Sequence, residues 1–388
     1  MKLRIITGRA GAGKSKLVLE TIAAQRFERP QILLVPEHAT HEAELDLCRA
    51  LGDTASRDGE VLSFQSLATR VLSQTGGISD ITLDNGGKIL IMRRALQEVS
   101  SYLTVFSKPS QRPAFLRELV ALADELYAYK IAPSLLLQQV QDIPGAAGDK
   151  LRSTALLFGA YDARLQGGDF DARSKVQKLC DKLPNSDYLC GKDIYIDGFS
   201  YFNRTEEDII AAALKQANSV TVTLLGDDSD PQLFRNGIQQ RERLRRLAKD
   251  AGCSCEVENL VRNSDTAFSH LERYFLGAEK AWTGGTPSIT LYQANTAYSE
   301  VEYVSAQLRA LAQKGVRWRE MAVAARNMEV YGPLLEAVFR RDDVPAYISR
   351  RSDILEQPVL TLLLSAVDAV TGGFEYEDVF RCLKTGMT

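Results

Sequence analysis

Residues 8–15 read GRAGAGKS and match the pattern G-x-x-x-x-G-K-[ST] of a phosphate-binding loop. Glycines at 8, 11 and 13 allow backbone N–H groups to turn toward an anion, and a helix that begins near Gly13 would direct its positive end at the same anion. Lys14 would reach the terminal phosphates of ATP, and the Ser15 hydroxyl would bind Mg²⁺. The predicted nucleotide contacts in this loop are Gly8, Arg9, Ala10, Gly11, Ala12, Gly13, Lys14 and Ser15.

The other interpretation of this stretch is a glycine-rich turn that contains GKS by chance. The flanking sequences favour the phosphate loop, since KLRIIT before it predicts a strand and KLVLETIAAQ after it has helical spacing. The sequence therefore predicts nucleotide binding, and hydrolysis is a separate question.

A phosphate-loop ATPase also needs a carboxylate at the end of a neighbouring strand to hold Mg²⁺, often followed by a Glu that activates water. Asp197 in IYIDGF meets the first requirement, but the next residue is Gly198. The other interpretation of Asp197 is a strand-ending residue in a D-G turn. A further strand, SVTVTLLGD, ends at Gly226 and Asp227 with no Gln directly after it. These departures predict a site that binds nucleotide better than it cleaves it.

The elements around these residues predict an α/β protein. Short strands alternate with helices in residues 1–84 and 186–280, which indicates a P-loop domain built on a parallel, doubly wound sheet. Residues 85–185 show only helical spacing and are expected to form a helical insertion in that domain. Residues 286–388 alternate again, with strands expected in SITLYQA, MAVAAR and PAYIS, and are expected to begin a second α/β domain with its own helical insertion, truncated at the chain end.

The composition is that of a soluble globular protein of two or three domains, with 388 residues, 45% apolar and 25% charged. The net charge of −3 means that any DNA contact must come from local patches, such as the arginines of QQRERLRRLAK, for which a solvated helix face is the other interpretation. No apolar stretch reaches the roughly 18 residues of a membrane span, and no signal peptide is present. The six cysteines lack zinc-site spacing and indicate reduced thiols in a cytoplasmic protein.

Four stretches together resemble the N-terminal, helicase-like part of the AddB (RexB) subunits of bacterial AddAB helicase–nucleases: ITGRAGAGKS, ILLVPEHATHEAELDL, VLSFQSLATRVLSQTGG and IYIDGFSYFNRTE. The resemblance covers essentially the whole chain. It implies a RecA-like fold, a partnership with an AddA-like motor subunit, and the processing of DNA double-strand breaks for recombination. It also implies a degenerate scaffold that scans single-stranded DNA for the Chi sequence. The nuclease domain and iron–sulfur cluster of the family are expected only in a C-terminal part that this chain lacks.

The last hundred residues are similar to the start of the second motor domain of UvrD-like, superfamily 1 helicases. That resemblance implies that Arg326 in AVAAR contacts the γ-phosphate and that Glu300 or Glu302 lies near the nucleotide. In the same relatives, the loop after the second strand approaches single-stranded DNA, and the positions that match it are His38, Thr40 and His41. A further candidate DNA contact lies in SFQSL, where Phe64 is followed by Gln65; packing or capping is the other interpretation of these residues.

Three functions stay open at the level of the sequence. The first is an AddB-type subunit that binds ATP, Mg²⁺ and DNA as a scaffold and sequence sensor. The second is an active superfamily 1 helicase or translocase, for which Asp227 or Asp228 would have to supply the missing general base. The third is a small-molecule kinase, which the helical insertion and the second α/β unit disfavour.

Overall fold

The computed structural model describes residues 2–26, 28–52, 57, 59–76, 83–103, 105–106, 113–140, 143–166, 175–261, 266–274, 281–286, 288–348, 354 and 357–387. Contacts divide the chain into two compact units, Met1–Ser264 and Asp265–Thr388, and each has a hydrophobic core of its own. The sequence predicts a domain boundary after residue 280, which lies outside the described residues.

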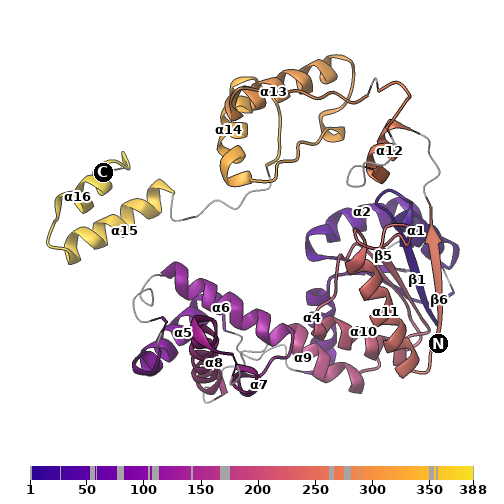
Figure 1. Ribbon diagram of the computed structural model, residues 1–388, viewed down its shortest axis with the longest axis horizontal. Coiled ribbons are helices and arrows are strands. Elements are labelled where there is room, and N and C mark those ends of the chain that lie inside the picture. Colours follow the sequence, from indigo (N-terminus) through magenta and orange to yellow (C-terminus); the bar gives the residue numbers. More distant parts are fainter. Residues whose placement is uncertain are drawn as a thin grey trace. The chain divides into compact units, whose positions relative to one another are not determined.

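Six strands in the described residues form the centre of the first unit, and all of the pairs between them are parallel (Figure 1). Their spatial order is β3-β2-β4-β5-β1-β6. The parallel sheet predicted from the sequence is confirmed. Because parallel strands bring their carboxyl ends to one edge, the residues that follow β1, β4 and β5 meet there. The strands are β1 (Lys2–Gly8), β2 (Gln31–Leu34), β3 (Gly59–Leu62), β4 (Asp193–Ile196), β5 (Ser219–Leu225) and β6 (Ser254–Leu260).

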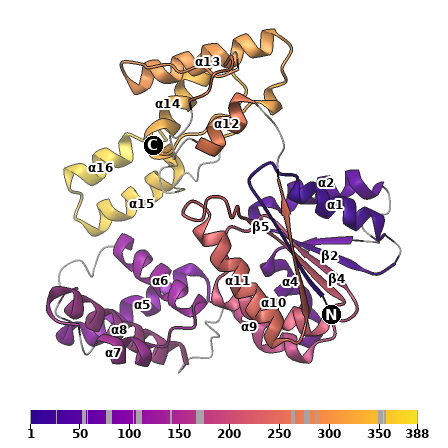
Figure 2. The same cartoon turned by 45° about the vertical axis from the view of Figure 1, so that its right-hand side comes forward.

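Helices cover both faces of this sheet, which explains why its central strands are apolar nearly throughout. Alternate residues of β1 enter different cores, with Leu3 and Ile5 in one and Ile6 in the other. Figure 2 shows α1 and α2 on one side of the strands and α10 and α11 on the other. The helical elements are α1 (Lys14–Ala24), η1 (Glu37–Ala39), α2 (Thr40–Leu51), α4 (Phe64–Thr75), α9 (Lys175–Lys182), η5 (Leu183–Asn185), α10 (Arg204–Gln216) and α11 (Arg235–Asp250).

Side-chain caps fix where two of these helices begin. The Ser63 hydroxyl accepts a hydrogen bond from the backbone N–H of Ser66, 3.1 Å away, at the start of α4. At the start of α10, Asn203 and Glu206 each accept a hydrogen bond from the other's backbone N–H, at 3.0 and 2.9 Å. Both caps satisfy N–H groups that a helix cannot pair internally, and so they fix the first residue of each helix.

The predicted helical insertion contains α5 (Asn85–Val99), η3 (Ser100–Tyr102), α6 (Pro113–Ala128), α7 (Pro133–Val140) and α8 (Gly145–Gln166). Its own core includes Met92, Leu119 and Tyr161. The described residues between 85 and 185 contain no strand. α9 behaves differently from α5–α8, because Leu179 belongs to the core of the sheet. The insertion therefore has two parts, a separate helical core and a last helix that anchors it to the sheet.

The second unit consists of α12 (Ala267–Tyr274), α13 (Ala297–Gln313), η6 (Trp318–Glu320), α14 (Met328–Arg341), α15 (Pro358–Thr371) and α16 (Tyr376–Leu383). The sequence predicts strands in residues 288–294, 321–326 and 345–349, and these predictions are wrong for the described residues of this unit, none of which pairs in a ladder. Alternating apolar residues favour an extended backbone, but a strand is stabilised only by hydrogen bonds to a neighbour. Within the described chain, no helix has both the length and the apolar character needed to cross a bilayer.

Candidate nucleotide site

The phosphate loop lies between the carboxyl end of β1 and the first turn of α1, as the sequence predicts. Gly11 and Gly13 have φ angles of 70° and 89°, a left-handed conformation that favours glycine. At Gly8 a side chain is excluded, because an added Cβ would lie 2.7 Å from the carbonyl oxygen of Leu260. Three glycines are thus required by the backbone itself, and the loop ends at a helix N-terminus, which favours anions.

Lys14 closes over the loop. Its Nζ donates hydrogen bonds to the carbonyl oxygens of Gly8 and Arg9, both 2.8 Å away. Burial lowers the pKa of Lys14, and the charge of Asp197 acts against this shift, so the carboxylate lies within electrostatic reach of the ammonium group. Ser15 is exposed in the first turn of α1. The cation and the hydroxyl that a triphosphate and its metal would require are therefore presented at one end of the sheet.

Asp197 directly follows β4, and its position is fixed by two hydrogen bonds. Its backbone N–H donates to the carbonyl oxygen of Leu34 at 2.9 Å, and its carboxylate accepts a hydrogen bond from the hydroxyl of Thr223 in β5. Gly198, the next residue, has a φ of 81° and turns the chain away. β5 alone separates β4 from β1 in the sheet. Asp197 and the phosphate loop therefore share the carboxyl edge, which fits a Mg²⁺ held between Ser15 and Asp197.

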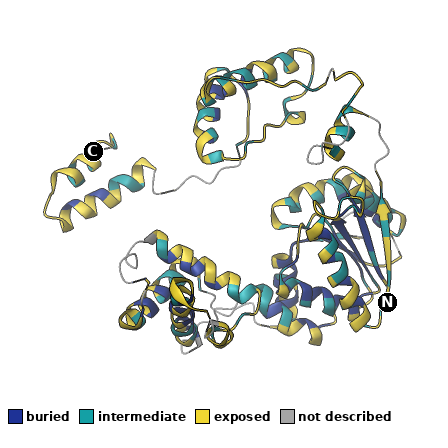
Figure 3. Cartoon of the chain, in the orientation of Figure 1, coloured by how far each residue is buried: buried dark blue, intermediate teal, exposed yellow. Residues whose placement is uncertain are grey.

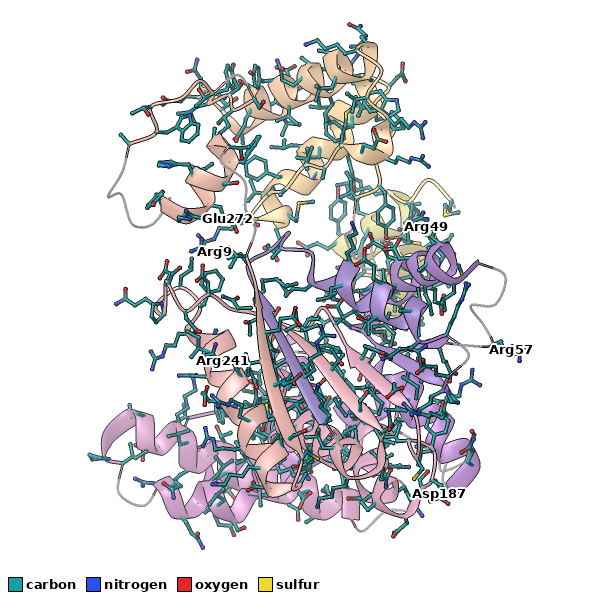
Figure 4. The ribbon with its side chains drawn as sticks, turned by 90° about the vertical axis from the view of Figure 1, so that its right-hand side faces the viewer. Arg9, Arg49, Arg57, Asp187, Arg241 and Glu272 are labelled. Carbon is teal, nitrogen blue, oxygen red and sulfur yellow. The ribbon has the colours of Figure 1, made fainter. Side chains whose placement is uncertain are left out.

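Arg9, predicted as a nucleotide contact, forms an ion pair with Asp227. Its Nε lies 2.5 Å from Oδ2 of Asp227, and its guanidinium lies 5.1 Å from the ring centroid of Phe234. Figure 4 labels Arg9 near the carboxyl end of the strands. The two side chains are mostly buried, with 13% of Arg9 and 22% of Asp227 exposed. The loop is thereby attached to the segment that joins β5 to α11.

Asp227 is also engaged through its other carboxylate oxygen, which accepts hydrogen bonds from the backbone N–H and the hydroxyl of Ser229 at 2.8 and 2.6 Å. Burial raises the pKa of Asp227, but the hydrogen bonds from Ser229 and Arg9 outweigh it and lower the pKa to about 2. Asp228, the other candidate base, lies 2.9 Å from Arg241 of α11. A carboxylate with so low a pKa is a poor general base, which disfavours the catalytic role considered for Asp227.

No local motif marks the pair between Arg9 and Asp227, which are 218 positions apart. A usable signal is present in the order of elements. Opposite charges that directly follow two parallel strands meet at the same sheet edge when the strands are neighbours, as β1 and β5 are.

Comparisons with known proteins identify the family of this chain. The family model described as "ADDB, N-terminal" matches residues 5–272. The chain belongs to this AddB N-terminal family. Similar relatives are named as the B subunits of an ATP-dependent helicase/deoxyribonuclease. The one from Acetivibrio thermocellus is 32% identical over all of this chain and 36% of its own length, and the one from Desulforamulus reducens is 31% identical over the same shares. The one from Bacillus thuringiensis is 28% identical over 99% of this chain and 35% of its own length.

The chain thus spans about a third of the length of these AddB-family relatives. Their shared name denotes one component of a helicase/deoxyribonuclease and so implies a partner subunit for them. The activities of these longer relatives are therefore only proposals for this chain.

The candidate DNA contacts of this AddB-family chain lie near one another at the carboxyl edge. His38 in η1 and His41 in α2 are exposed, and Thr40 donates a hydrogen bond to the carbonyl oxygen of Glu37 at 2.9 Å. Phe64 is only 5% exposed and meets Phe199 edge to face, with ring centroids 5.3 Å apart. The histidines are therefore available to a ligand, whereas Phe64 is largely a packing residue.

A cavity of about 530 Å³ opens beside Phe64, between the carboxyl ends of β2 and β3 and the helical insertion. Its lining includes side chains from α5 and α6 of the insertion. No sequence motif marks these side chains. Lys88 and Asp124 form an ion pair of 2.8 Å there, and Tyr127 adds an aromatic ring. The insertion thus contributes one wall of a pocket whose other wall is the sheet edge.

Arg326 belongs to the second unit, where it is exposed just before α14. Its predicted contact with the γ-phosphate stays a prediction. The two acidic candidates of that unit have partners within it: Glu300 accepts a hydrogen bond from the Tyr331 hydroxyl at 2.7 Å, and Glu302 lies 2.7 Å from Arg341. Both carboxylates therefore help to hold α13 against α14.

Proposed function

We propose that this chain is the helicase-like N-terminal region of an AddB-type subunit, which binds ATP with Mg²⁺ and single-stranded DNA. It acts in the cytoplasm as a scaffold and Chi-scanning element, rather than as a motor, in a heterodimer with an AddA-like subunit that processes double-strand breaks for homologous recombination. One observation supports this most strongly: a complete phosphate loop faces Asp197, while Gly198 and the paired Asp227 occupy the positions from which a general base would act.

The residues at the carboxyl edge fit ATP and Mg²⁺. The loop begins at Gly8, where an added Cβ would lie 2.7 Å from the carbonyl oxygen of Leu260. Lys14 supplies a cation, and Ser15 with Asp197 supplies the oxygen ligands that Mg²⁺ prefers. When bound, Mg²⁺ would neutralise phosphate charge. The iron–sulfur cluster that the AddB resemblance implies belongs, in this proposal, to a nuclease domain outside the chain.

Slow turnover follows from the missing base. Water attack on a γ-phosphate needs a residue that orients or deprotonates the water. Gly198 has no side chain for this, and Asp227 is held by Arg9 and Ser229 with a pKa of about 2. In the competing proposal of an active superfamily 1 motor, Asp228 would have to leave Arg241, from which it lies 2.9 Å.

The pocket beside Phe64 supports the proposed contact with single-stranded DNA. The Tyr127 ring in its lining provides a stacking surface for bases. His38 and His41 lie outside that lining, and as exposed polar groups they tolerate a phosphate backbone. The pocket also holds Glu37 and Glu206, so a continuous phosphate path through it is disfavoured. Base contacts, rather than backbone contacts, are the chemistry that this pocket offers.

The test is the binding and turnover of ATP by the chain, with Lys14→Ala as the variant and Lys16→Ala as the control. Lys16 is on the same helix but is 80% exposed. We expect the chain and Lys16→Ala to bind Mg-ATP in calorimetry and Lys14→Ala to lose binding by about 2–4 kcal/mol, since a charged hydrogen-bonding group is removed. Absence of Mg-ATP binding by the unmodified chain would refute the nucleotide site.

The scaffold role is tested in the heterodimer. We expect strand displacement on duplex DNA to continue when the AddB-type protein carries Lys14→Ala, and ATP turnover by the chain alone to stay slow with single-stranded DNA present. Loss of unwinding in that heterodimer, or rapid DNA-stimulated turnover by the isolated chain, would favour the active motor instead.

A further inference from the structure

Lys130 has a backbone conformation that glycine normally provides. It lies two residues beyond the end of α6 and has a φ of 56°. The helix ends there in a left-handed turn, in which the N–H of Ile131 donates a hydrogen bond to the carbonyl oxygen of Leu126 at 2.9 Å. Glycine is preferred at such a position, because the Cβ of any other residue comes too close to a carbonyl oxygen. A lysine that keeps this conformation therefore indicates a function for its side chain.

The Lys130 side chain reaches two helices that belong to the core of the sheet. Its Nζ forms an ion pair with Asp208 of α10 and donates to the sulfur of Cys180 in α9 at 3.7 Å. The hydrogen bond to Asp208 raises the pKa of Lys130, so the ammonium group stays charged at neutral pH. Both helices are anchored in the sheet core, α9 through Leu179 and α10 through Ile209. These contacts with Cys180 and Asp208, the Lys130 bridge, tie the end of α6 to that core.

A second polar contact joins α6 to α10 beside the Lys130 bridge. The Thr205 hydroxyl donates a hydrogen bond to the carbonyl oxygen of Ala128, 3.0 Å away, at the last residue of α6. Thr205 is only 2% exposed, so this hydrogen bond is shielded from water. The insertion has a hydrophobic core separate from that of the sheet, and Figure 3 shows the two groups of buried residues. Polar contacts at the end of α6 therefore help to fix the insertion against the sheet.

These contacts adjoin the pocket beside Phe64. Tyr127 and Ala128 of α6 and Thr205 of α10 all belong to its lining. Tyr127 precedes Lys130 by three residues, which is about one helical turn. Figure 1 shows α6 running from the insertion toward α9 and α10. A displacement of the end of α6 would therefore move the wall that the insertion contributes to the pocket.

We propose that Lys130 is a positioning residue, which holds the end of α6, and with it the Tyr127 ring, in place in the pocket beside Phe64. The inference rests on the proposed function in that single-stranded DNA is the ligand of this pocket. Glycine would suit the backbone turn but could not form the bridge. Arg204 lies 3.5 Å from the carboxylate of Asp208, so α10 keeps a cation beside Asp208 when Lys130 is replaced. The bridge can thus be removed without leaving a carboxylate unpaired.

Three substitutions of Lys130 separate the bridge from the backbone strain. Lys130→Met removes the charge and keeps the strain, Lys130→Gly removes both, and Lys130→Arg keeps a long cationic side chain. Lys215→Met is the control, since Lys215 is exposed in the last turn of α10. We expect amide exchange in residues 122–131 to be about threefold to tenfold faster in Lys130→Met, and unchanged in Lys130→Arg and Lys215→Met. Thermal unfolding should occur at a higher temperature in Lys130→Gly than in Lys130→Met, because glycine relieves the turn.

Binding of single-stranded oligothymidylate by the chain measures the effect on the pocket. We expect Lys130→Met and Lys130→Gly to weaken binding equally, by about threefold, although their unfolding temperatures differ, and Lys130→Arg to bind as the unmodified chain does. Tyr127→Ala should weaken binding about fivefold or more, because a stacking ring is lost. The double variant of Lys130→Met and Tyr127→Ala should bind no more weakly than Tyr127→Ala alone, since the bridge acts through this ring.

The proposal is overturned by any of three results: unchanged exchange at the end of α6 in Lys130→Met, weakened binding by Lys130→Arg, or losses from Lys130→Met and Tyr127→Ala that multiply in the double variant. Absence of oligothymidylate binding by the unmodified chain, or unchanged binding by Tyr127→Ala, would instead refute the proposed DNA contact of the pocket. The exchange measurement needs no DNA, and it then decides by itself whether Lys130 holds the end of α6.

Discussion

The ion pair between Arg9 and Asp227 attaches the phosphate loop to the segment after β5, and its removal should loosen both. The relevant local bond is the one that Gly226 N–H donates to the carbonyl oxygen of Gly8, 3.3 Å away, next to the ion pair. Arg9→Ala removes the guanidinium that lies 2.5 Å from Asp227 and also the cation over the Phe234 ring. We expect the loop and the Gly226–Phe234 segment to open more often in this variant.

The magnitude follows from the lowered pKa of Asp227. A fall in its pKa from 3.8 to about 2 corresponds to about 2 kcal/mol in favour of the charged form. Solvent screening reduces this to about 1–2 kcal/mol, since 22% of the side chain is exposed. Ser229 donates two of the hydrogen bonds that hold the carboxylate, so the share of Arg9 is about 1 kcal/mol. An opening equilibrium would therefore shift about fivefold.

Amide hydrogen exchange, followed by mass spectrometry on peptides that contain Gly226 and the loop, measures this opening locally. A double-mutant cycle with Asp227→Asn should give a coupling of about 1 kcal/mol, so the double variant should exchange about fivefold more slowly than the sum of the two single effects would predict. The pair Arg241–Asp228 is the matched control, because 62% of Asp228 is exposed and its coupling should stay below about 0.5 kcal/mol. Independent, additive effects of Arg9→Ala and Asp227→Asn would refute the reasoning.

Three further predictions concern the same edge of the sheet. The Asp227 pKa is depressed in the folded state, so its stabilisation is full above about pH 4 and lost as pH falls through about 2; wild type should therefore lose about 1–2 kcal/mol more than Asp227→Asn between these pH values in local exchange. Gly13→Ala should cost about 1–2 kcal/mol in thermal unfolding because its φ is 89°, whereas alanine at the exposed Ser73 should change little. Thr223→Val, which removes the hydroxyl that bonds Asp197, should weaken Mg²⁺-dependent ATP binding about threefold to tenfold, with ATP binding in chelator unchanged.

Local patterns predict the nucleotide site well because its parts are close in the chain. The phosphate loop, the strand before it and the helix after it lie within residues 2–24, and the left-handed φ angles at Gly11 and Gly13 are the reason that this loop needs glycine. The strand ending at Asp197 is predicted in the same way. Apolar runs buried on both faces of a parallel sheet are readable in the sequence, which is why the parallel sheet of the first unit is predictable.

The second unit shows where such patterns fail. Residues 321–325 have the composition of a strand but have no ladder partner among the described residues of the unit. Composition favours an extended backbone locally, and pairing is a property of two segments. The same distinction applies to the DNA candidates, since the pocket beside Phe64 depends on Lys88, Asp124 and Tyr127 of the insertion, which no motif marks.

The amino-acid sequence alone determined the phosphate loop, the carboxylate at Asp197, the parallel sheet and the AddB resemblance, because each depends on residue types at short spacing. Only the tertiary structure decided what the charged side chains do. It paired Arg9 with Asp227, and among the described strands it placed only β1 beside β6. The physical reason is that the strand order brings residues more than two hundred positions apart to the carboxyl ends of neighbouring strands. Charge pairing and exposure depend on that arrangement.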